Sequence, residues 1–305
     1  MKISVALAVY NGTAFLREQL ISLAHQTRPA DEIVVCDDAS SDGSAEFVRR
    51  TAQEIGLSGC TVFENDQNLG YRKNFRQAVS LCRGDLIFLC DQDDIWHPEK
   101  IRGMAECFAR DDFLLSLCSA IRRVDEHGCP ISGNYRSGTN CGLMKTKTPK
   151  GQLRRVCFEE VLHGNIAPGC TMAVRKELAR QFVDNSQSVL PHDWEMNLVA
   201  ACEKGLAFCN REWTDYRLHS SNTLGWEPKP QTRLEIAREK AEALEQICRY
   251  RDQNEERKLF EKRLSLLSNR DAAGMAALWK NRIYRRFFSF RERLGDWRYC
   301  RSFRK

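Results

Sequence analysis

The first hundred residues alternate short apolar runs with amphipathic segments. Four of the runs are rich in β-branched and aliphatic residues, as expected of strands buried on both faces. They span residues 3–9, 33–36, 61–63 and 86–90. Between them apolar residues recur at helical spacing, for example at Leu16, Leu20 and Leu23. This order predicts an α/β fold with a Rossmann-like, mostly parallel central sheet and helices on both faces.

Polar residues follow three of these runs at the point where each run ends. Tyr10 and Asn11 follow the first run, Asp37 and Asp38 follow the second, and the Asp-Gln-Asp-Asp tetrad of residues 91–94 follows the fourth. The carboxyl ends of parallel strands share one edge of a sheet, and ligands bind beyond that edge. Core packing does not explain five carboxylates on one edge, so we expect a polar binding site there.

The pattern changes twice farther along the chain. Residues 111–226 are less regular and contain many Gly, Thr and Arg residues, as expected of loops that bind an acceptor. Pro228 and Pro230 interrupt the chain, and Thr232 with Glu235 then forms a capping-box pattern before a charged helical segment. We expect a domain over 1–226 with halves 1–110 and 111–226, a helical region over 227–281 and a basic tail over 282–305.

Composition is ordinary for a globular protein, with 42% hydrophobic and 29% charged residues, and it excludes a disordered or collagen-like chain. The fourteen cysteines are scattered without a Cys-x-x-Cys pair, which favours reduced core thiols over zinc or disulfide sites. The N-terminus does not resemble a signal peptide, and no apolar stretch is long enough to cross a bilayer. We expect a cytoplasmic protein.

Charge is concentrated at the C-terminal end. The net charge is +6, but residues 282–305 alone hold nine basic and two acidic residues, so the remainder carries a net charge of −1. Aromatic residues lie among these cations, a composition that suits an anionic membrane surface. A solvated or partner-binding segment is the alternative. Nucleic-acid binding is not expected, because no nucleic-acid module accompanies the tail.

The Asp-Gln-Asp-Asp tetrad is the sharpest chemical feature of the sequence. Closely spaced carboxylates repel one another unless a cation lies among them, and hard oxygen ligands suit Mg²⁺ or Mn²⁺. Such a cation typically binds between the protein and a diphosphate. A solvated acidic turn is the alternative explanation for the tetrad.

The sequence resembles the family 2 glycosyltransferases, inverting enzymes of the GT-A fold that use nucleotide sugars. The matching pieces occur in family order over roughly residues 1–226, and the Asp-Gln-Asp-Asp-Ile-Trp string with a later His-Asp-Trp is most similar to a bacterial rhamnosyltransferase-like branch. The pieces are residues 4–12 (SVALAVYNG), 34–43 (VVCDDASSDG), 84–96 (GDLIFLCDQDDIW), 169–172 (GCTM), 192–194 (HDW) and 216–219 (YRLH).

The resemblance implies a nucleotide-sugar site on the first half of the domain. Asp38 is expected to accept hydrogen bonds from the base, with Ala8 and Tyr10 beside a uracil or thymine ring. The metal is expected at Asp91 and Asp93, with His219 as a further ligand; a hydrogen-bonded loop histidine is the alternative. The residues expected to bind the donor are Ala8, Tyr10, Asn11, Asp38, Asn74, Asp91 and Gln92.

Asp193 is the expected general base, because inversion needs a carboxylate that takes the proton of the acceptor hydroxyl. A helix N-terminal aspartate is the alternative. His192 is expected to orient or tune it, unless it is a surface histidine. The expected donor–acceptor boundary comprises Gly169, Cys170, Thr171, His192 and Trp194, and Trp194 and Trp226 are candidates for stacking on sugar rings, although core packing is the commoner role of tryptophan.

One position departs from the family pattern. Many family members carry an arginine that reaches the pyrophosphate in the helix after Asn-x-Gly, whereas this sequence has Phe75 in that register. Arg72, Lys73 and Arg76 lie nearby, so the sequence leaves open which cation contacts the diphosphate.

We therefore expect an inverting, metal-dependent glycosyltransferase that moves a sugar from a UDP- or dTDP-sugar to a saccharide acceptor. The acceptor is expected to be lipid-linked and to belong to a bacterial surface polysaccharide such as O-antigen or capsule, with the enzyme peripheral on the inner face of the cell membrane; an oligomer remains open. The alternatives are a nucleotidyltransferase acting on sugar phosphates and a catalytically dead nucleotide-sugar-binding protein.

Overall fold

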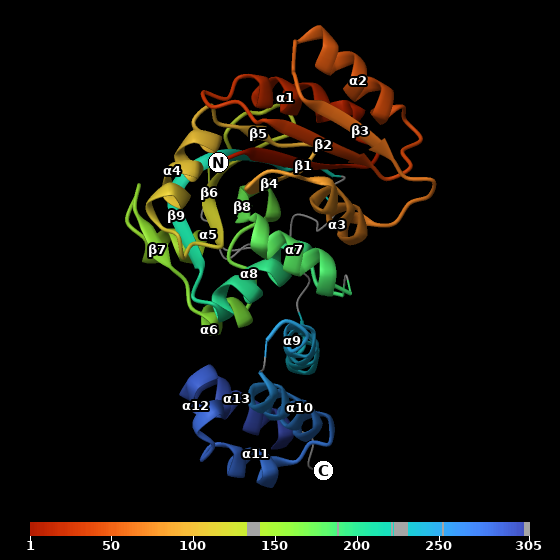
Figure 1. Ribbon diagram of the computed structural model, residues 1–305. Helices are drawn as coiled ribbons and strands as arrows, with labels where there is room; N and C mark the ends of the chain where they lie inside the picture. Colours follow the sequence, from red (N-terminus) through yellow and green to blue (C-terminus); the bar gives the residue numbers. More distant parts are fainter. Residues whose placement is uncertain (133–140, 188, 221, 223–230, 252, 302–305) are drawn as a thin grey trace. The chain divides into compact units, whose positions relative to one another are not determined.

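A computed structural model describes residues 1–132, 141–187, 189–220, 222, 231–251 and 253–301 (Figure 1). The chain divides into two compact units, Met1–Pro228 and Lys229–Lys305, and each is described by itself. The predicted boundary at residue 226, Trp226 itself and the last four residues of the predicted tail lie outside the described residues.

The first unit is built on one mixed sheet. In the described part of the chain, its strands follow the order β3-β2-β1-β4-β8-β6-β9-β5, and β7 pairs with β9. The strands are β1 (Ile3–Val9), β2 (Glu32–Asp37), β3 (Cys60–Glu64), β4 (Leu86–Cys90), β5 (Ile95–Trp96), β6 (Ser116–Val124), β7 (Leu153–Arg155), β8 (Met172–Arg175) and β9 (Leu206–Arg217).

The four predicted strands form the parallel half of this sheet. β1 pairs in parallel with β2 and with β4, and β2 pairs in parallel with β3. Beyond β4 the sheet is mixed, because β8 runs antiparallel to both β4 and β6, while β6 and β9 are parallel. The α/β fold is confirmed, and the parallel arrangement ends where the regular strand–helix alternation of the sequence ends.

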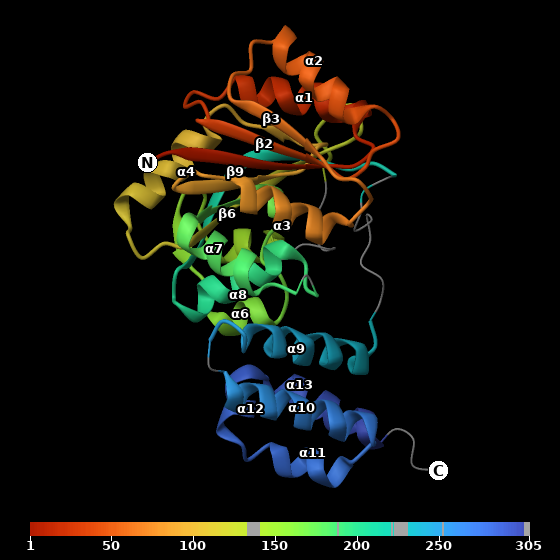
Figure 2. The same ribbon diagram turned by 45° about the vertical axis from the view of Figure 1, so that its right-hand side comes forward.

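Helices cover both faces of the parallel half. α1 and α2 lie on one face and α3 with α7 on the other (Figures 1 and 2). α1 faces the sheet through Leu16, Leu20 and Leu23, which are buried as their helical spacing predicts. The helices of this unit are α1 (Thr13–Ala24), α2 (Ser44–Glu54), α3 (Tyr71–Leu81), α4 (Lys100–Arg110), α5 (Cys141–Lys147), α6 (Phe158–Leu162), α7 (Lys176–Asn185) and α8 (His192–Cys202), with a 3₁₀ turn, η1 (Gly169–Thr171).

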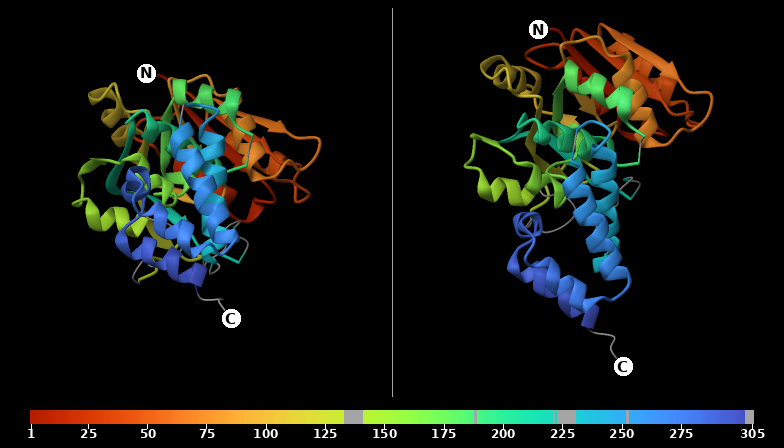
Figure 3. Two further views of the ribbon diagram at one scale, coloured as in Figure 1. Left: turned by 90° about the horizontal axis from the view of Figure 1, so that it is seen from below. Right: turned by 60° about the horizontal axis from the view of Figure 1, so that its bottom comes forward.

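The second unit is helical. The long helices α9 and α10 pack along each other (Figure 3). The predicted capping box is present: the Thr232 hydroxyl accepts a hydrogen bond from the Glu235 amide at 3.2 Å, and the Glu235 carboxylate accepts one from the Thr232 amide at 2.7 Å. Its helices are α9 (Arg233–Ile247), α10 (Asn254–Ser268), α11 (Ala272–Leu278), α12 (Arg282–Phe287) and α13 (Phe290–Arg301).

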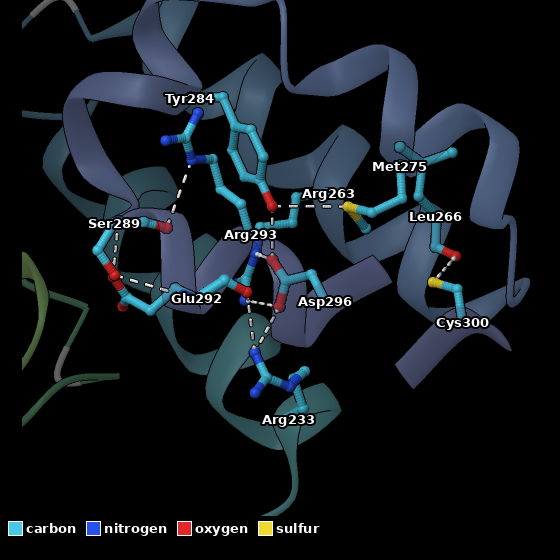
Figure 4. Close-up of polar contacts among 10 residues, drawn as sticks. All are labelled: Arg233, Arg263, Leu266, Met275, Tyr284, Ser289, Glu292, Arg293, Asp296 and Cys300. Atoms are coloured by element: carbon cyan, nitrogen blue, oxygen red, sulfur yellow. Dashed lines mark hydrogen bonds and ion pairs between the residues drawn. The ribbon is translucent and has the colours of Figure 1, made fainter. Parts of the chain in front are cut away.

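The segment predicted as a separate basic tail belongs to this helical unit. Tyr284, Phe287 and Phe288 are buried, because the aromatic residues between the cations supply the apolar face of α12 and its junction with α13. Asp296 of α13 is fully buried and accepts hydrogen bonds at 2.8 Å from Arg263 and at 2.7 Å from the Tyr284 hydroxyl (Figure 4). Residues 282–301 therefore form part of the core of the unit.

Among the described residues, no helix combines the length and the apolar character that crossing a membrane requires.

Candidate active site

One cavity of about 610 Å³ lies at the carboxyl ends of β1 and β4. It brings together most of the residues that the sequence singles out. The predicted residues that line it are Ala8, Tyr10, Asn11, Asp38, Asn74, Asp91, Gln92, Asp93, Gly169, His192, Asp193 and His219. Segments far apart in the sequence thus contribute to a single site.

The loops after β1 and β4 are tied to each other. The Tyr10 amide donates to Oε1 of Gln92 at 2.8 Å, and Nε2 of Gln92 donates to the Tyr10 carbonyl at 3.0 Å. A side chain at Gly12 would place its Cβ 2.3 Å from Oε1 of Gln92, so glycine permits this approach. Gln92 therefore positions the β1 loop, while the Tyr10 ring stays half exposed at the cavity.

Asp38 is buried at the end of β2 and is held by donors of its own chain. Its carboxylate accepts hydrogen bonds from Nδ2 of Asn65 and the Leu69 amide, both at 2.8 Å, and from the Gly70 amide at 2.9 Å. Asn74 lies beside it, and its Nδ2 donates to the Cys36 carbonyl at 2.9 Å. These contacts fix the carboxylate at the cavity wall, and Asn65 is a site residue that sequence reasoning missed.

Two carboxyl groups of the acidic tetrad, those of Asp91 and Asp94, have raised pKa values. Burial raises the pKa of Asp91 well above its usual range, and the neighbouring carboxylates of Asp94, Asp93 and Asp193 raise it further. Burial and the charge of Asp93 raise the pKa of Asp94 to about 7. Raised pKa values mean that the positive charge around these two carboxylates is too small to offset their burial and mutual repulsion.

Two buried cations, Arg217 and Lys100, lie near the tetrad, and the sequence analysis assigned neither of them a role. Arg217 is fully buried; its amide donates to Oδ1 of Asp94 at 3.0 Å and its guanidinium to the Asp93 carbonyl at 2.8 Å. Lys100 donates to the Thr214 hydroxyl at 2.9 Å and to the Cys170 carbonyl, and burial lowers its pKa to about 8.

Asp93 and His219 meet as the resemblance implies. Nε2 of His219 lies 2.9 Å from Oδ2 of Asp93, and the imidazole packs on the Phe15 ring with the centroids 4.6 Å apart. Oxygen and sulfur atoms of Asp91, Asp94 and Cys170 also cluster within 4.8 Å of one another. Burial raises the pKa of the Cys170 thiol well above its usual range, and sulfur is a softer ligand than Mg²⁺ or Mn²⁺ prefers. The carboxylates with His219 fit a hard divalent cation.

The cavity itself supplies little positive charge. No lysine or arginine belongs to its lining in the part of the chain that the structure describes. Near Phe75, Arg76 donates to the Val183 carbonyl at 3.0 Å and Arg72 donates to the Val189 carbonyl. A diphosphate in this cavity would therefore gain no neutralising charge from lysine or arginine side chains of the described lining.

Asp193 lies in the first turn of α8 and lines the cavity. It is buried, and its carboxylate accepts hydrogen bonds from Nδ2 of Asn165 at 2.7 Å and from the Trp194 amide at 2.8 Å. Burial outweighs these hydrogen bonds and raises its pKa to about 6. A pKa close to neutral suits a group that accepts a proton during a reaction.

His192 is buried beside Asp193 rather than exposed on the surface. Its ring stacks on Phe75, with centroids 3.9 Å apart and an angle of 21° between the planes. Burial, with a smaller effect from the charge of Arg72, lowers the pKa of His192 to about 3, so the imidazole is neutral. Phe75, the departure from the family pattern, thus serves as the platform for this histidine.

Three residues predicted at the donor–acceptor boundary are buried behind the cavity instead of lining it. Cys170 is fully buried, and the Thr171 hydroxyl donates to the Pro168 carbonyl at 2.7 Å. Nε1 of Trp194 donates to the Val161 carbonyl at 2.8 Å, so this tryptophan is a core residue with a satisfied indole. η1 begins at Gly169, and of its three residues only Gly169 lines the cavity.

Comparison with known proteins shows the family of the chain. The family model described as Glycosyl transferase family 2 matches residues 4–182. The dTDP-rhamnosyl transferase RfbG of Shigella flexneri is 26% identical over 234 residues, which cover 72% of this chain and 73% of that protein.

Solved structures show the same fold at low sequence identity. S. aureus TarS 1-349 in complex with UDP-GlcNAc superposes with a TM-score of 0.60 at 16% identity, covering 98% of this chain and 79% of that one. The mannosyltransferase PcManGT from Pyrobaculum calidifontis in complex with GDP-Man and Mn²⁺ gives 0.57 at 17% identity, covering 96% and 78%. With more than half of its length matched by the family model, the chain belongs to glycosyl transferase family 2, and its fold is GT-A-like.

Proposed function

We propose that the protein transfers a sugar from a UDP- or dTDP-sugar to a hydroxyl group of a saccharide acceptor, with inversion at the anomeric carbon. One observation carries the proposal: a single cavity holds Asp38, the Asp91–Asp93 loop and Asp193. In this proposal Asp38 binds the nucleoside, the Asp91–Asp93 loop binds the diphosphate through a metal ion, and Asp193 accepts the proton of the reacting hydroxyl. The similarity to a dTDP-rhamnosyl transferase supports a pyrimidine nucleotide donor.

Mg²⁺ or Mn²⁺ fits the diphosphate end of the cavity. Asp91 and Asp93 would hold the ion with His219, and the absence of lysine and arginine from the described lining leaves room for its charge. The bound ion would stabilise the negative charge that develops on the leaving diphosphate. Arg217 holds this loop in place through the Asp94 carboxylate and the Asp93 carbonyl, and the charge of Lys100 favours the ionised forms of Asp91 and Asp94.

Asp193 would take the proton from the acceptor hydroxyl. Its pKa of about 6 leaves it deprotonated at neutral pH while keeping it basic enough to accept a proton. Asn165 and the Trp194 amide fix its orientation. A protein that only binds nucleotide sugars has no use for a buried, destabilised carboxylate at this position, which disfavours the catalytically dead alternative.

The test is a product assay on the purified chain with UDP- and dTDP-sugars, saccharide acceptors and Mn²⁺ or Mg²⁺. Glycosyl transfer releases a nucleoside diphosphate, whereas a nucleotidyltransferase, supplied in a parallel assay with a nucleoside triphosphate and a sugar phosphate, releases inorganic diphosphate. Asp193→Asn should bind the donor and fail to transfer, while Asp184→Asn, at an exposed position of α7, should behave as wild type. Release of inorganic diphosphate, or unchanged turnover of Asp193→Asn, would overturn the proposal.

The finer proposal is a lipid-linked acceptor of a bacterial surface polysaccharide, reached at the inner face of the cell membrane. Residues 272–291 contain no acidic residue. Arg282, Arg285 and Arg291 are exposed there, and Phe290 is 60% exposed between them. Exposed cations close in the sequence to an exposed aromatic residue suit an anionic lipid surface, where each cation contributes roughly 1 kcal/mol.

Charge reversal tests this contact better than truncation, because residues 282–301 also form the core of the helical unit. The triple variant Arg282→Glu, Arg285→Glu and Arg291→Glu should lose binding to phosphatidylglycerol vesicles by at least about 100-fold, from three cations at roughly 1 kcal/mol each. A matched control reverses Lys2, Arg110 and Lys150, exposed cations of the first unit. Equal losses in both variants would show that net charge, rather than this surface, drives binding.

A further inference from the structure

His192 has no structural reason to be a histidine. The side chain is 6% exposed, and neither Nδ1 nor Nε2 has a hydrogen-bond partner among the described residues. Its contacts are aromatic: the stacked Phe75 ring, and the edge of Tyr71 with centroids 6.3 Å apart. A phenylalanine would fill the same space without burying two unsatisfied nitrogens, which are costly to stability.

The ring nevertheless lies at the cavity. His192, Phe75 and Tyr71 all belong to its lining, together with Gly169 and Asp193. A Cβ at Gly169 would lie 2.8 Å from Nε2 of His192, so only a residue without a side chain fits against this nitrogen, and both ring nitrogens are buried. The residue with the unsatisfied nitrogens therefore belongs to the wall of the cavity, beside Gly169 and the candidate base.

The chemistry of the ring restricts what the ligand can be. A neutral imidazole has one donor and one acceptor nitrogen, and a hydroxyl group can both accept and donate a hydrogen bond. Because the pKa of His192 is about 3, the ring carries no charge at neutral pH, so it has no electrostatic preference for a phosphate group. An uncharged polyhydroxylated ligand, a sugar, matches it best.

We propose that His192 is a specificity-determining residue that hydrogen-bonds a hydroxyl group of a sugar bound in the cavity. The inference rests on the proposed glycosyl transfer and adds a contact to it. Either the donor sugar or the acceptor sugar supplies the hydroxyl. Phe75 and Tyr71 hold the ring in position, and the hydrogen bond that the free protein lacks is completed by the ligand.

The decisive variant is His192→Phe, which keeps the stack on Phe75 and removes both nitrogens. Its control is Thr51→Val in α2, which also removes a buried polar atom without a partner but lies outside the cavity lining. Without ligand, both variants should be at least as thermally stable as wild type. With substrates, His192→Phe should lose at least tenfold in kcat/KM, whereas Thr51→Val should lose nothing.

The kinetic constants identify the sugar. If the donor supplies the hydroxyl, His192→Phe raises the donor KM and reduces the thermal shift caused by the nucleotide sugar, but not the shift caused by the nucleoside diphosphate alone. If the acceptor supplies it, only the acceptor KM rises. His192→Gln, whose amide also donates and accepts, should recover part of the loss.

Three results would overturn the proposal. One is kcat/KM of His192→Phe equal to wild type for both substrates. Another is a shifted acid limb of the pH–rate profile in His192→Phe, which would mean that the residue acts on Asp193 instead of on a sugar. If His192→Phe does not fold, deoxy-sugar substrates are compared on wild type, and equal rates with every single-deoxy donor and acceptor would refute it. A wild-type protein that transfers no sugar at all refutes the proposed function itself, whatever the variant does.

Discussion

Replacing Asp193 with asparagine separates catalysis from stability in one substitution. The change preserves the size of the side chain and removes a buried negative charge. Because the pKa rises from 3.8 to about 6 on folding, the carboxylate costs about 3 kcal/mol of folding free energy at pH 8 and about half of that at pH 5. The ionised Asp193 thus lowers the free energy of unfolding of the native protein, and asparagine removes this destabilisation.

A lost hydrogen bond offsets part of the gain. Nδ2 of Asn165 donates to the carboxylate at 2.7 Å, and a hydrogen bond to a charged group contributes about 1.5–3 kcal/mol. At a single pH these two effects oppose each other, so the pH dependence of the stability is the quantity that reports the raised pKa of Asp193. A raised native pKa favours the wild type at low pH, and that advantage disappears as the pH rises through 6. Relative to wild type, Asp193→Asn should gain about 1.5 kcal/mol between pH 5 and pH 8.

Urea unfolding followed by tryptophan fluorescence at the two pH values measures this difference, with Asp184→Asn as the exposed control. Transfer activity, measured on the same preparations, should fall by about 10² to 10⁴-fold when the general base is lost. A stability difference that is the same at both pH values would show that the pKa of Asp193 is not raised. Transfer within tenfold of wild type would show that Asp193 is not the base.

Three further substitutions test other parts of the structure. Asp93→Ala should abolish the enhancement of donor binding by Mn²⁺, measured by calorimetry with and without the ion, and undiminished enhancement would place the metal elsewhere. Arg217→Met should lower the free energy of unfolding by about 3 kcal/mol and weaken donor binding, because it leaves the Asp93 carbonyl without its donor; a stable variant with normal binding would contradict the supporting role. Asp296→Asn should destabilise the helical unit by about 3–5 kcal/mol in urea unfolding, because Arg263 loses its buried partner. Burial raises the pKa of Asp296, but its hydrogen bonds and the charge of Arg263 outweigh burial and lower the pKa overall. The wild type should therefore lose this stability as the pH falls through the native pKa of Asp296, whereas Asp296→Asn should not.

The parallel half of the sheet and the edge it presents could be predicted because they depend on local patterns. Apolar runs end in polar residues at Tyr10, Asp38 and Asp91, and parallel strands carry their ends to one edge. The same reasoning did not extend to Cys170 and Trp194. Nothing in a linear motif distinguishes a residue that faces the cavity from its neighbour that faces the core.

The supporting residues were missed for a different reason. Arg217 lies within residues 216–219, which match the family pattern, and Asn65 follows the third predicted strand at residues 61–63. Their partners are 124 and 27 positions away, and only the fold brings them together. The aromatic residues of 282–301 were expected at a membrane surface or in a solvated or partner-binding segment, yet Tyr284, Phe287 and Phe288 are buried within the helical unit, because α12 and its junction with α13 pack there.

The pair of hydrogen bonds between Gln92 and the Tyr10 backbone links two positions that lie 82 residues apart. Glycine at position 12 is compatible with glutamine at position 92 because the glutamine amide occupies the place where a Cβ would stand. Among related sequences, an alanine at position 12 should therefore occur with a shorter residue at position 92. In a double-mutant cycle, Gly12→Ala and Gln92→Ser should together cost less than the sum of the two separate losses. These two motifs of the sequence are thus expected to evolve as a pair.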